Sequence, residues 1–248
     1  MSQRVPSVLL LAQAGSTMDV LHELAQGGAP AGSAVVAEEQ VGGRGSRGRD
    51  WASPQGGLWL SVLARPAAAG LELLSLRSGL AVAEALDRVG LVDRVQLKWP
   101  NDLMLGHRKA GGILCEARWQ GTAPAWVVIG LGLNVTNQPT AALETTATCL
   151  ARSEPSLTAA ALVAPMVAAL RAVDPGAGPL TADERARYAS RDWLRGRAVR
   201  GPIAGTADGL AADGGLLIRQ EDGTTETLRA GTVVLAGPSP AVDLSSCS

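Results

Sequence analysis

The chain has 248 residues, which is long enough to bury a full hydrophobic core and to hold one large domain with a smaller one. Its formal net charge of -1 and sequence pI of about 6.1 argue against a nucleic-acid partner, and the apolar run at residues 8–12 is too short for a signal segment or a membrane-spanning helix. Three widely spaced cysteines and two histidines argue against a disulfide framework and a histidine-rich metal centre, so we expect a cytoplasmic protein with reduced thiols.

Several segments before residue 90 have the apolar pattern of strands or helices. They are a buried strand over residues 5–12, a helix over 17–26, strands over 33–40 and 58–64, and a helix over 71–89. Ser16 is placed to cap the first helix and Gly27 to end it. The apolar Val20, Leu21 and Leu24 are expected to form the buried face of this helix.

The second half begins with short strands whose connections have no room for crossover helices, which predicts a mostly antiparallel sheet. A helical region is expected from about 157 to 195. Pro165 is expected to kink its first helix, and Thr181 with Glu184 predicts a capping box at the start of the second. Short strands separated by Asp-Gly turns over 197–236 then predict a small β-barrel.

The composition marks one window of the chain as a candidate site. Alanine and glycine abound, arginine dominates the basic residues and asparagine is rare, as under GC-rich coding drift. A lysine or asparagine that remains under such drift is favoured where arginine or aspartate cannot take its place. The residues that remain are Lys98, Asn101, Lys109, Asn134 and Asn137.

The stretch GRGSRG, residues 43–48, matches the G-x-G-x-x-G fingerprint of dinucleotide-binding folds. That fingerprint must open a helix, and the following segment has no helical periodicity and contains Pro54. The stretch is therefore a loop between two strands. It carries Arg44, Arg47 and Arg49 among glycines with open backbone amides, which favours anion binding over the alternative of a solvated basic surface loop.

Three further motifs carry polar side chains at strand ends. In KWPNDL, Asn101 and Asp102 suit hydroxyl or amine groups of a ligand or the water shell of Mg²⁺, although an Asx turn explains them equally well. In RKAGGILCE, Lys109 precedes two glycines that open a strand, so its ammonium is placed to reach across a pocket floor. Asn134 ends the apolar run GLGLN, where the alternative is a simple turn cap.

Together these motifs resemble the biotin protein ligases. The resemblance covers residues 7 to about 236 and is carried by ST in GSTMD, EEQ before GRGSRGRDW, KWPNDL, RKAGGIL with Glu116, and GLGLN. It implies an α+β catalytic domain over residues 1–195, in which a mixed, mainly antiparallel sheet is flanked by helices as in class II aminoacyl-tRNA synthetases. It also implies an SH3-like β-barrel over 196–237 and a flexible tail over 238–248.

The resemblance implies a two-step reaction. Biotin and Mg-ATP give biotinyl-5'-AMP and pyrophosphate, and a lysine of a biotin carboxyl carrier protein domain then takes the biotinyl group. The resemblance also allows a homodimer and implies neither a DNA nor a membrane partner. Because the motifs begin by residue 16, we expect a ligase that is not a repressor. The alternatives are a lipoate or octanoate ligase or transferase of the same fold, and a biotin sensor without catalysis.

The resemblance also assigns the site residues. Biotin contacts fall on Ser16, Thr17, Gln40, Gly43, Arg44, Gly45, Ser46, Lys109, Gly111 and Gly112. ATP contacts fall on Arg44, Arg47, Arg49, Trp51, Asn101, Asp102 and Asn134, with Asp102 also expected to bind the Mg²⁺ of ATP. Lys109 is expected to bridge the biotin carboxylate and the α-phosphate, with Arg44 beside them, so these two are the expected catalytic residues. Met18 stands where family members often have asparagine, and Ser46 where they usually have a second arginine.

Overall fold

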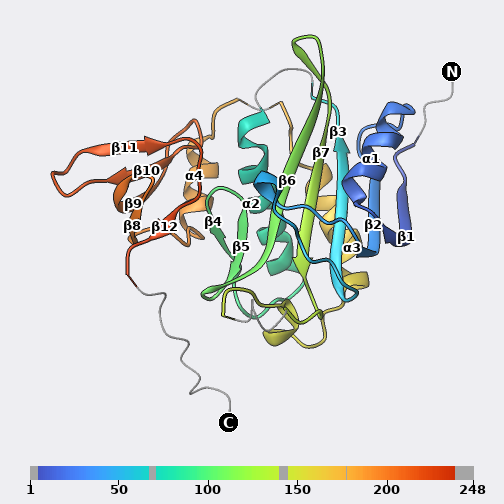
Figure 1. The fold of residues 1–248 in the computed structure, drawn as a ribbon, viewed down its shortest axis with the longest axis horizontal. Coiled ribbons are helices and arrows are strands. Elements are labelled where there is room, and N and C mark those ends of the chain that lie inside the picture. Colours follow the sequence, from blue (N-terminus) through green and yellow to red (C-terminus); the bar gives the residue numbers. More distant parts are fainter. Residues whose placement is uncertain (1–4, 67–70, 140–144, 177, 238–248) are drawn as a thin grey trace.

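The computed structural model describes residues 5–66, 71–139, 145–176 and 178–237 (Figure 1). A seven-stranded sheet forms its centre, in the order β1-β2-β3-β7-β6-β5-β4. Its strands are β1 (Val8–Ala14), β2 (Ala34–Gln40), β3 (Gly57–Ala64), β4 (Gln96–Lys98), β5 (Asp102–Leu105), β6 (Arg108–Gln120) and β7 (Ala123–Asn134). Only β1 and β2 are parallel among the paired strands, so the expected mixed and mainly antiparallel sheet is confirmed.

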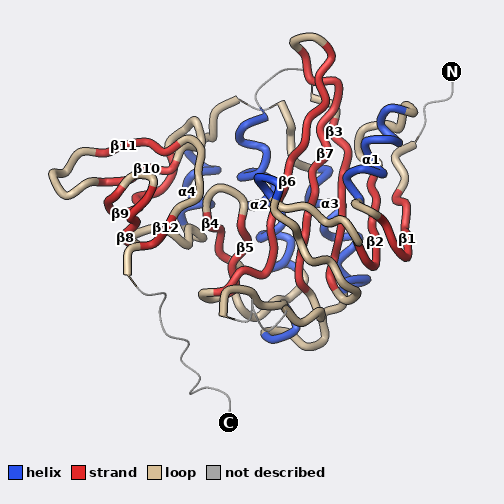
Figure 2. Tube along the Cα trace, viewed as in Figure 1, coloured by secondary structure: helices blue, strands red, loops and turns tan. Residues whose placement is uncertain are grey.

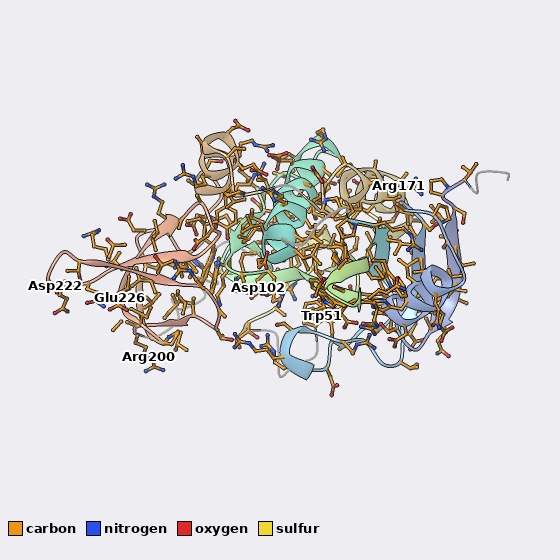
Figure 3. All side chains as sticks on the ribbon, turned by 90° about the horizontal axis from the view of Figure 1, so that it is seen from above. Trp51, Asp102, Arg171, Arg200, Asp222 and Glu226 are labelled. Carbon is orange, nitrogen blue, oxygen red and sulfur yellow. The ribbon has the colours of Figure 1, made fainter. Side chains whose placement is uncertain are left out.

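Helices cover the two faces of this sheet differently. Helix α1 (Thr17–Gln26) packs on β2, β3 and β7, whereas α2 (Leu74–Arg88) and α3 (Ala159–Arg171) fill the opposite face (Figures 1 and 3). The side chains of β7 alternate between the two faces and therefore contribute to a separate apolar core on each. Ile129, Leu131 and Leu133 join the core beneath α2 and α3, and Val128 joins the smaller cluster beneath α1.

The chain after α3 continues into helix α4 (Ala182–Ala189) and a second, five-stranded antiparallel sheet in the order β11-β10-β9-β8-β12 (Figure 2). Its strands are β8 (Ala198–Gly201), β9 (Ala204–Leu210), β10 (Leu216–Arg219), β11 (Thr225–Leu228) and β12 (Val234–Leu235). Ile218 of β10 belongs to the same apolar core as Leu73, which lies just before α2, and the Trp99 indole donates to the Gly214 carbonyl at 2.9 Å. The two sheets are therefore joined by shared packing.

Two helix starts agree with the sequence analysis. The first helix has the expected bounds, and the Ser16 side chain accepts a hydrogen bond from the amide of Met18. Thr181 and Glu184 form the expected capping box of α4. Helix α3 runs as one helix through Pro165. The expected flexible tail, residues 238–248, lies outside the described residues.

Two expectations about burial were wrong. Strand β1 is largely exposed, and its Leu10 is 67% exposed. The reason is that β1 lies at the edge of the described sheet and pairs with β2 alone. In α1 the buried apolar face is formed by Met18, Leu21 and Ala25, while Leu24 is 39% exposed. No helix in the described ranges is long and apolar enough to cross a membrane.

Candidate functional site

The floor of the candidate site is a bare stretch of backbone in the middle of the sheet. Gly112 of β6 pairs directly with Gly132 of β7, so two facing positions carry no side chain. The loop between β2 and β3 crosses this floor (Figure 1), and a Cβ atom at Gly132 would lie only 2.9 Å from Trp51 Nε1. Glycine is therefore required at position 132 for the Trp51 indole to lie against the sheet.

A small pocket of about 40 Å³ lies at this floor, beneath α1 and the loop. Its polar wall is a hydrogen-bonded set: the Thr17 amide and hydroxyl donate to Gln40 Oε1 at 2.8 and 3.1 Å, and Gln40 Nε2 donates to Ser53 at 3.0 Å. It unites most of the residues expected to contact biotin, namely Ser16, Thr17, Gln40, Arg44, Gly45, Ser46 and Gly112. Its apolar lining comes from Met18, Leu60, Ile113, Leu114 and Leu131.

Two glycines with expected biotin contacts are required by packing in the structure. A Cβ at Gly43 would lie 2.4 Å from both Ser53 Oγ and the Trp51 carbonyl, so this glycine allows the loop to close on itself. A Cβ at Gly111 would lie 2.7 Å from the Gly132 carbonyl. Neither glycine is among the described residues that line the small pocket, and their contacts with biotin stay predictions.

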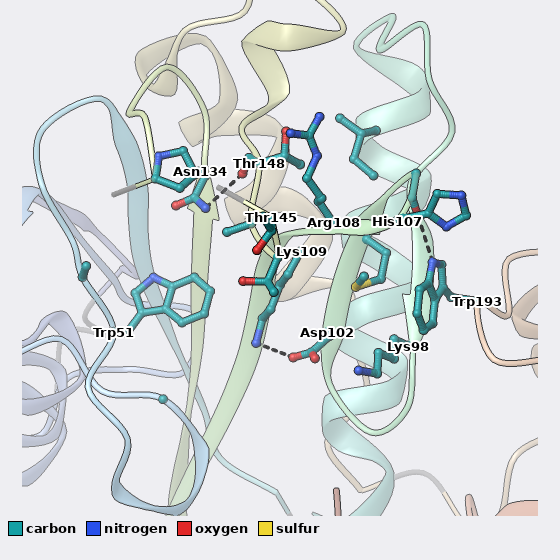
Figure 4. Close-up of a pocket in the computed structure, with 18 of the residues that line it drawn as sticks. Trp51, Lys98, Asp102, His107, Arg108, Lys109, Asn134, Thr145, Thr148 and Trp193 are labelled. Atoms are coloured by element: carbon teal, nitrogen blue, oxygen red, sulfur yellow. Dashed lines mark hydrogen bonds and ion pairs between the residues drawn. The ribbon is translucent and has the colours of Figure 1, made fainter. Parts of the chain in front are cut away.

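A larger cleft of about 1060 Å³ opens beside the small pocket, between the central sheet and the C-terminal strands (Figure 4). It is lined by residues expected to contact ATP, namely Arg49, Trp51, Asp102 and Asn134, together with Lys98, Lys109 and Asn137. Asn101 instead lines the small pocket, and its amide donates to the Ile113 carbonyl at 2.7 Å. Each of the five residues singled out by the composition therefore lines one or the other of these two neighbouring cavities.

Lys109 lies where the two cavities meet. It pairs with Asp102, and its ammonium nitrogen is 4.8 Å from the centre of the Trp51 ring (Figure 4). The same nitrogen would be 3.5 Å from a Cβ at Gly112, which lines the small pocket. The ammonium therefore faces the small pocket from the side of the cleft.

Lys98 is a second cation in the cleft. Burial lowers its pKa, against the opposing effect of the Asp102 charge. Its ammonium lies 5.4 Å from the centre of the Trp193 ring. A partly desolvated cation of this kind interacts more strongly with an incoming anion than one in open water.

The arginines of the loop have separate partners. Arg44 makes a bidentate pair with Asp19 at 2.6 and 2.7 Å and approaches Glu116 at 3.4 Å. Its guanidinium holds the pKa of Asp19 below its usual value.

Further along the loop, Arg49 donates to the carbonyl and hydroxyl of Ser46 at 3.3 and 3.1 Å. Arg47, in the left-handed region with φ of 63°, donates to Thr232 of the C-terminal unit and lines a separate cavity of about 360 Å³.

Asn134 is engaged by its neighbours at the end of β7. Its Nδ2 donates to the Thr148 carbonyl at 3.0 Å, and its Oδ1 accepts from Asn137 at 2.9 Å. These contacts fit the turn-cap alternative. Each polar atom has capacity for one further bond, so the nucleotide contact stays a prediction.

The described residues contain no group of three or more histidine, cysteine or acidic side chains that would hold a metal by themselves. Asp102 is the carboxylate next to Lys109 in the cleft. One carboxylate suits Mg²⁺ that arrives on ATP, because this ion takes one or two protein carboxylates and completes its shell with phosphate oxygens and water.

Several residues of the site were not found from the sequence. Asp19 of α1 pairs with Arg44 of the loop, and His22 of α1 lies 3.3 Å from Glu116. Trp193 and Arg200, from the last quarter of the chain, line the cleft. Asp19 in the first turn of α1 was the one local signal, since a carboxylate beside Ser16-Thr17 is available to a nearby cation. The others depend on tertiary packing.

Comparisons with known proteins identify relatives of this chain. Residues 10–134 match the family model described as biotin/lipoate A/B protein ligase family, and residues 196–236 match the model of the biotin protein ligase C-terminal domain. The bifunctional ligase/repressor BirA of Bacillus subtilis is 37% identical over 127 residues, which are 50% of this chain and 39% of that protein. The biotin--[acetyl-CoA-carboxylase] ligase of Paracoccus denitrificans is 39% identical over 136 residues, which are 53% of this chain and 56% of the relative. The chain thus spans about 39 to 56% of the length of these two curated relatives.

Solved structures extend the likeness to nearly the whole chain. Biotin protein ligase from Aquifex aeolicus in complex with biotin and ATP superposes with a TM-score of 0.78 at 27% identity, covering 93% of this chain and 98% of the other. The Leishmania major biotin protein ligase in complex with biotinyl-5-AMP superposes with a TM-score of 0.63 at 30% identity, covering 92% and 100%.

Proposed function

Because the chain belongs to the biotin/lipoate A/B protein ligase family, we propose that it is a biotin protein ligase. It activates biotin with Mg-ATP to biotinyl-5'-AMP and transfers the biotinyl group to a lysine of a biotin carboxyl carrier domain. The observation that carries the proposal is the pair of adjoining cavities with Lys109 at their junction. One cavity is small and partly apolar, and the other is large enough for a nucleotide.

In the first step the biotin carboxylate attacks the α-phosphorus of ATP and pyrophosphate leaves. Two anions must approach each other, so catalysis depends on cations placed where negative charge develops. Lys109 supplies such a charge from the cleft side, next to Asp102, and Lys98 and Arg49 line the same cleft. No side-chain nucleophile is needed, because the substrate carboxylate is itself the nucleophile.

In the second step the lysine amine of the carrier attacks the acyl carbon of biotinyl-AMP. The C–O bond to the phosphate breaks, AMP leaves with the bond electrons, and the amine loses a proton to solvent or phosphate. Trp51 and Gly45 line both cavities, so the acyl-phosphate bond is proposed to lie beside them. The loop that carries them would then shield the mixed anhydride from water.

Mg²⁺ belongs to the proposal as the ion carried by ATP. Asp102 would hold it, since a carboxylate oxygen at the edge of a phosphate-binding cleft is the ligand this ion prefers. When Asp102 binds Mg²⁺, the pair between Lys109 and Asp102 would break, and the Lys109 ammonium would pair with the substrate anions. When bound, Mg²⁺ would neutralise phosphate charge, and the side chains of the protein would position the substrates.

The proposal is tested by incubating the protein with biotin, Mg-ATP and a purified biotin carrier domain. We expect AMP release and a biotinylated carrier lysine, detected by intact mass. Parallel ATP–pyrophosphate exchange with biotin and with lipoate tests the substrate class. Exchange with lipoate alone would reassign the protein to the lipoate branch, and biotin binding by calorimetry without AMP formation would make it a sensor.

A homodimer is part of the proposal. Strand β1 exposes Val8, Leu9 and Leu10 by 40, 38 and 67% at the edge of the sheet, where unpaired backbone groups favour addition of a second strand. Analytical sedimentation of the wild type and of Leu10→Asp measures the oligomeric state. We expect a dimer for the wild type and a monomer for the variant. A wild type that sediments as a monomer at micromolar concentration contradicts it.

A cytoplasmic location and a domain boundary near residue 195 complete the proposal. Cys115 and Cys149 are free thiols, and burial raises the pKa of Cys115 to about 12, as suits a structural cysteine in a reducing compartment. The C-terminal family match that begins at residue 196 supports the boundary.

A further inference from the structure

The side chain of Arg44 joins two elements that bound the small pocket. It is bidentate to Asp19 on α1 at 2.6 and 2.7 Å, and its Nε and Nη2 lie 3.4 Å from Glu116 on β6. Met18, next to Asp19, and Leu114, on the same face of β6 as Glu116, both line the pocket. Arg44 itself lines it as well, so the bridge from α1 to β6 runs along the pocket edge.

A buried histidine, His22, lies against the inner end of this bridge. Trp126 Nε1 donates to His22 Nδ1 at 2.9 Å, and since an indole nitrogen can only donate, the proton of the neutral imidazole is on Nε2. That nitrogen faces Glu116 Oε2 at 3.3 Å. Burial is the main cause that lowers the pKa of His22, so the ring stays neutral near pH 7. The ring next to Glu116 is therefore uncharged, and Arg44 is the cation that pairs with this carboxylate.

The outer end of the bridge is the end that can open. The Asp19 side chain is 52% exposed and the Arg44 side chain 33%, whereas the Glu116 side chain is 24% and the His22 side chain 8% exposed. The pocket now holds about 40 Å³, far below the roughly 300 Å³ of the smallest usual ligand pockets. Its floor belongs to paired strands, so entry of a bicyclic ligand requires movement of the loop and of the exposed contact between Arg44 and Asp19.

We propose that the Asp19–Arg44–Glu116 bridge is a strap that retains biotin and biotinyl-AMP in the small pocket, with Asp19 as a positioning residue that acts through Arg44. This inference rests on the proposed function. On this proposal Arg44 supplies the cation that Ser46 does not: Arg49 already donates to the Ser46 hydroxyl, and Arg44 ties the same loop to α1 and β6.

The test uses Asp19→Asn in the full-length protein, which removes the charge and keeps the shape. Biotinyl-AMP formed in the site should dissociate about three- to tenfold faster, the range for a well-formed but half-exposed bidentate ion pair. The KM for biotin should rise by a similar factor while kcat for adenylation changes less than about twofold. Asp19→Glu should restore slow release, because the longer carboxylate still reaches the guanidinium.

Glu23→Gln is the matched control. Glu23 lies one turn further along the exposed side of α1. Its replacement by glutamine removes the same charge without changing a contact of Arg44. It should leave the release rate unchanged. Added salt should speed release from the wild type and have less effect on Asp19→Asn, because an exposed ion pair is screened.

The outcomes separate the strap from the proposed function. A wild type that forms no biotinyl-AMP from biotin and ATP overturns both. A wild type that forms it and an Asp19→Asn variant that releases it at the wild-type rate overturn only the strap. Equal acceleration by Glu23→Gln, or identical salt dependence of wild type and Asp19→Asn, also overturns the strap, since helix charge alone would then explain the effect.

Discussion

Replacement of Lys109 by alanine removes the ammonium between Asp102 and Trp51. The fold should survive, because the structural contribution of this residue comes from its backbone: its amide donates to the Thr146 carbonyl at 2.8 Å, and its carbonyl accepts from the Thr148 amide at 2.9 Å. Its side chain is 25% exposed. We expect the free energy of unfolding to change by no more than about 1 kcal/mol.

The adenylation barrier should rise because the biotin carboxylate and the α-phosphate lose the cation proposed to lie between them. Loss of one preorganised electrostatic group at such a centre costs about 3 to 4 kcal/mol, which corresponds to a rate loss of roughly 100- to 1000-fold.

The assay is single-turnover formation of labelled biotinyl-AMP at saturating biotin and Mg-ATP. Arg118→Ala is the control, because Arg118 is an exposed cation on the same strand whose guanidinium donates to the adjacent Ala117 carbonyl. It should change the rate less than about twofold. A loss of tenfold or less in Lys109→Ala would refute the catalytic assignment, and an equal loss in Arg118→Ala would show that general charge is responsible.

Three further predictions concern the loop, its contact with the C-terminal unit and one buried ion pair. Ser46→Arg should slow release of biotinyl-AMP modestly, and more strongly when Arg47 is already alanine; if Arg47→Ala and Ser46→Arg both leave the off-rate unchanged, the loop does not cover the intermediate. Thr232→Val removes the acceptor of Arg47 and should raise the KM for ATP several-fold while biotin binding measured by calorimetry stays the same, and an unchanged KM would argue against a functional contact. Glu184→Gln should lower the free energy of unfolding at pH 7 by about 2 to 4 kcal/mol, because it leaves the buried Arg77 guanidinium without its carboxylate. Since Arg77 lowers the pKa of Glu184 from 4.5 to about 2, this stabilisation is complete above pH 4.5 and lost as the pH falls toward 2, so the wild-type and variant denaturation curves should converge; a constant gap contradicts the linkage.

Features with short-range signals were predictable from the sequence. Helix α1 begins after Ser16 and ends at Gly27, because a side-chain acceptor and a glycine act within one turn of the chain. The capping box of Thr181 and Glu184 is equally local. The composition argument for Lys98 and Lys109 also needs no knowledge of the fold, since it depends on what an ammonium does, and both residues line the same cleft.

Features set by distant neighbours were not predictable. An apolar run indicates a strand but not how many strands flank it, and β1 has a neighbour on one side only. The partners of Arg44 lie 25 and 72 residues away, and Arg47 reaches Thr232 across 185 residues. The sequence therefore predicted cations that line the cavities of the candidate site, and tertiary packing decided which carboxylate or hydroxyl each one meets.

The two residues that the sequence predicts as catalytic are both paired with carboxylates in the structure, Lys109 with Asp102 and Arg44 with Asp19 and Glu116. An unpaired ammonium and guanidinium in adjoining cavities would attract any phosphate, because a partly desolvated charge interacts strongly with anions. Pairing lowers that general attraction while it keeps each cation in position. Under the proposed function, a ligand would gain the full interaction with Lys109 only if it also gave Asp102 a new positive partner. ATP carrying Mg²⁺ would do so, whereas an isolated phosphate would not. Asp102 would then contribute to selectivity for Mg-ATP without touching the nucleotide base.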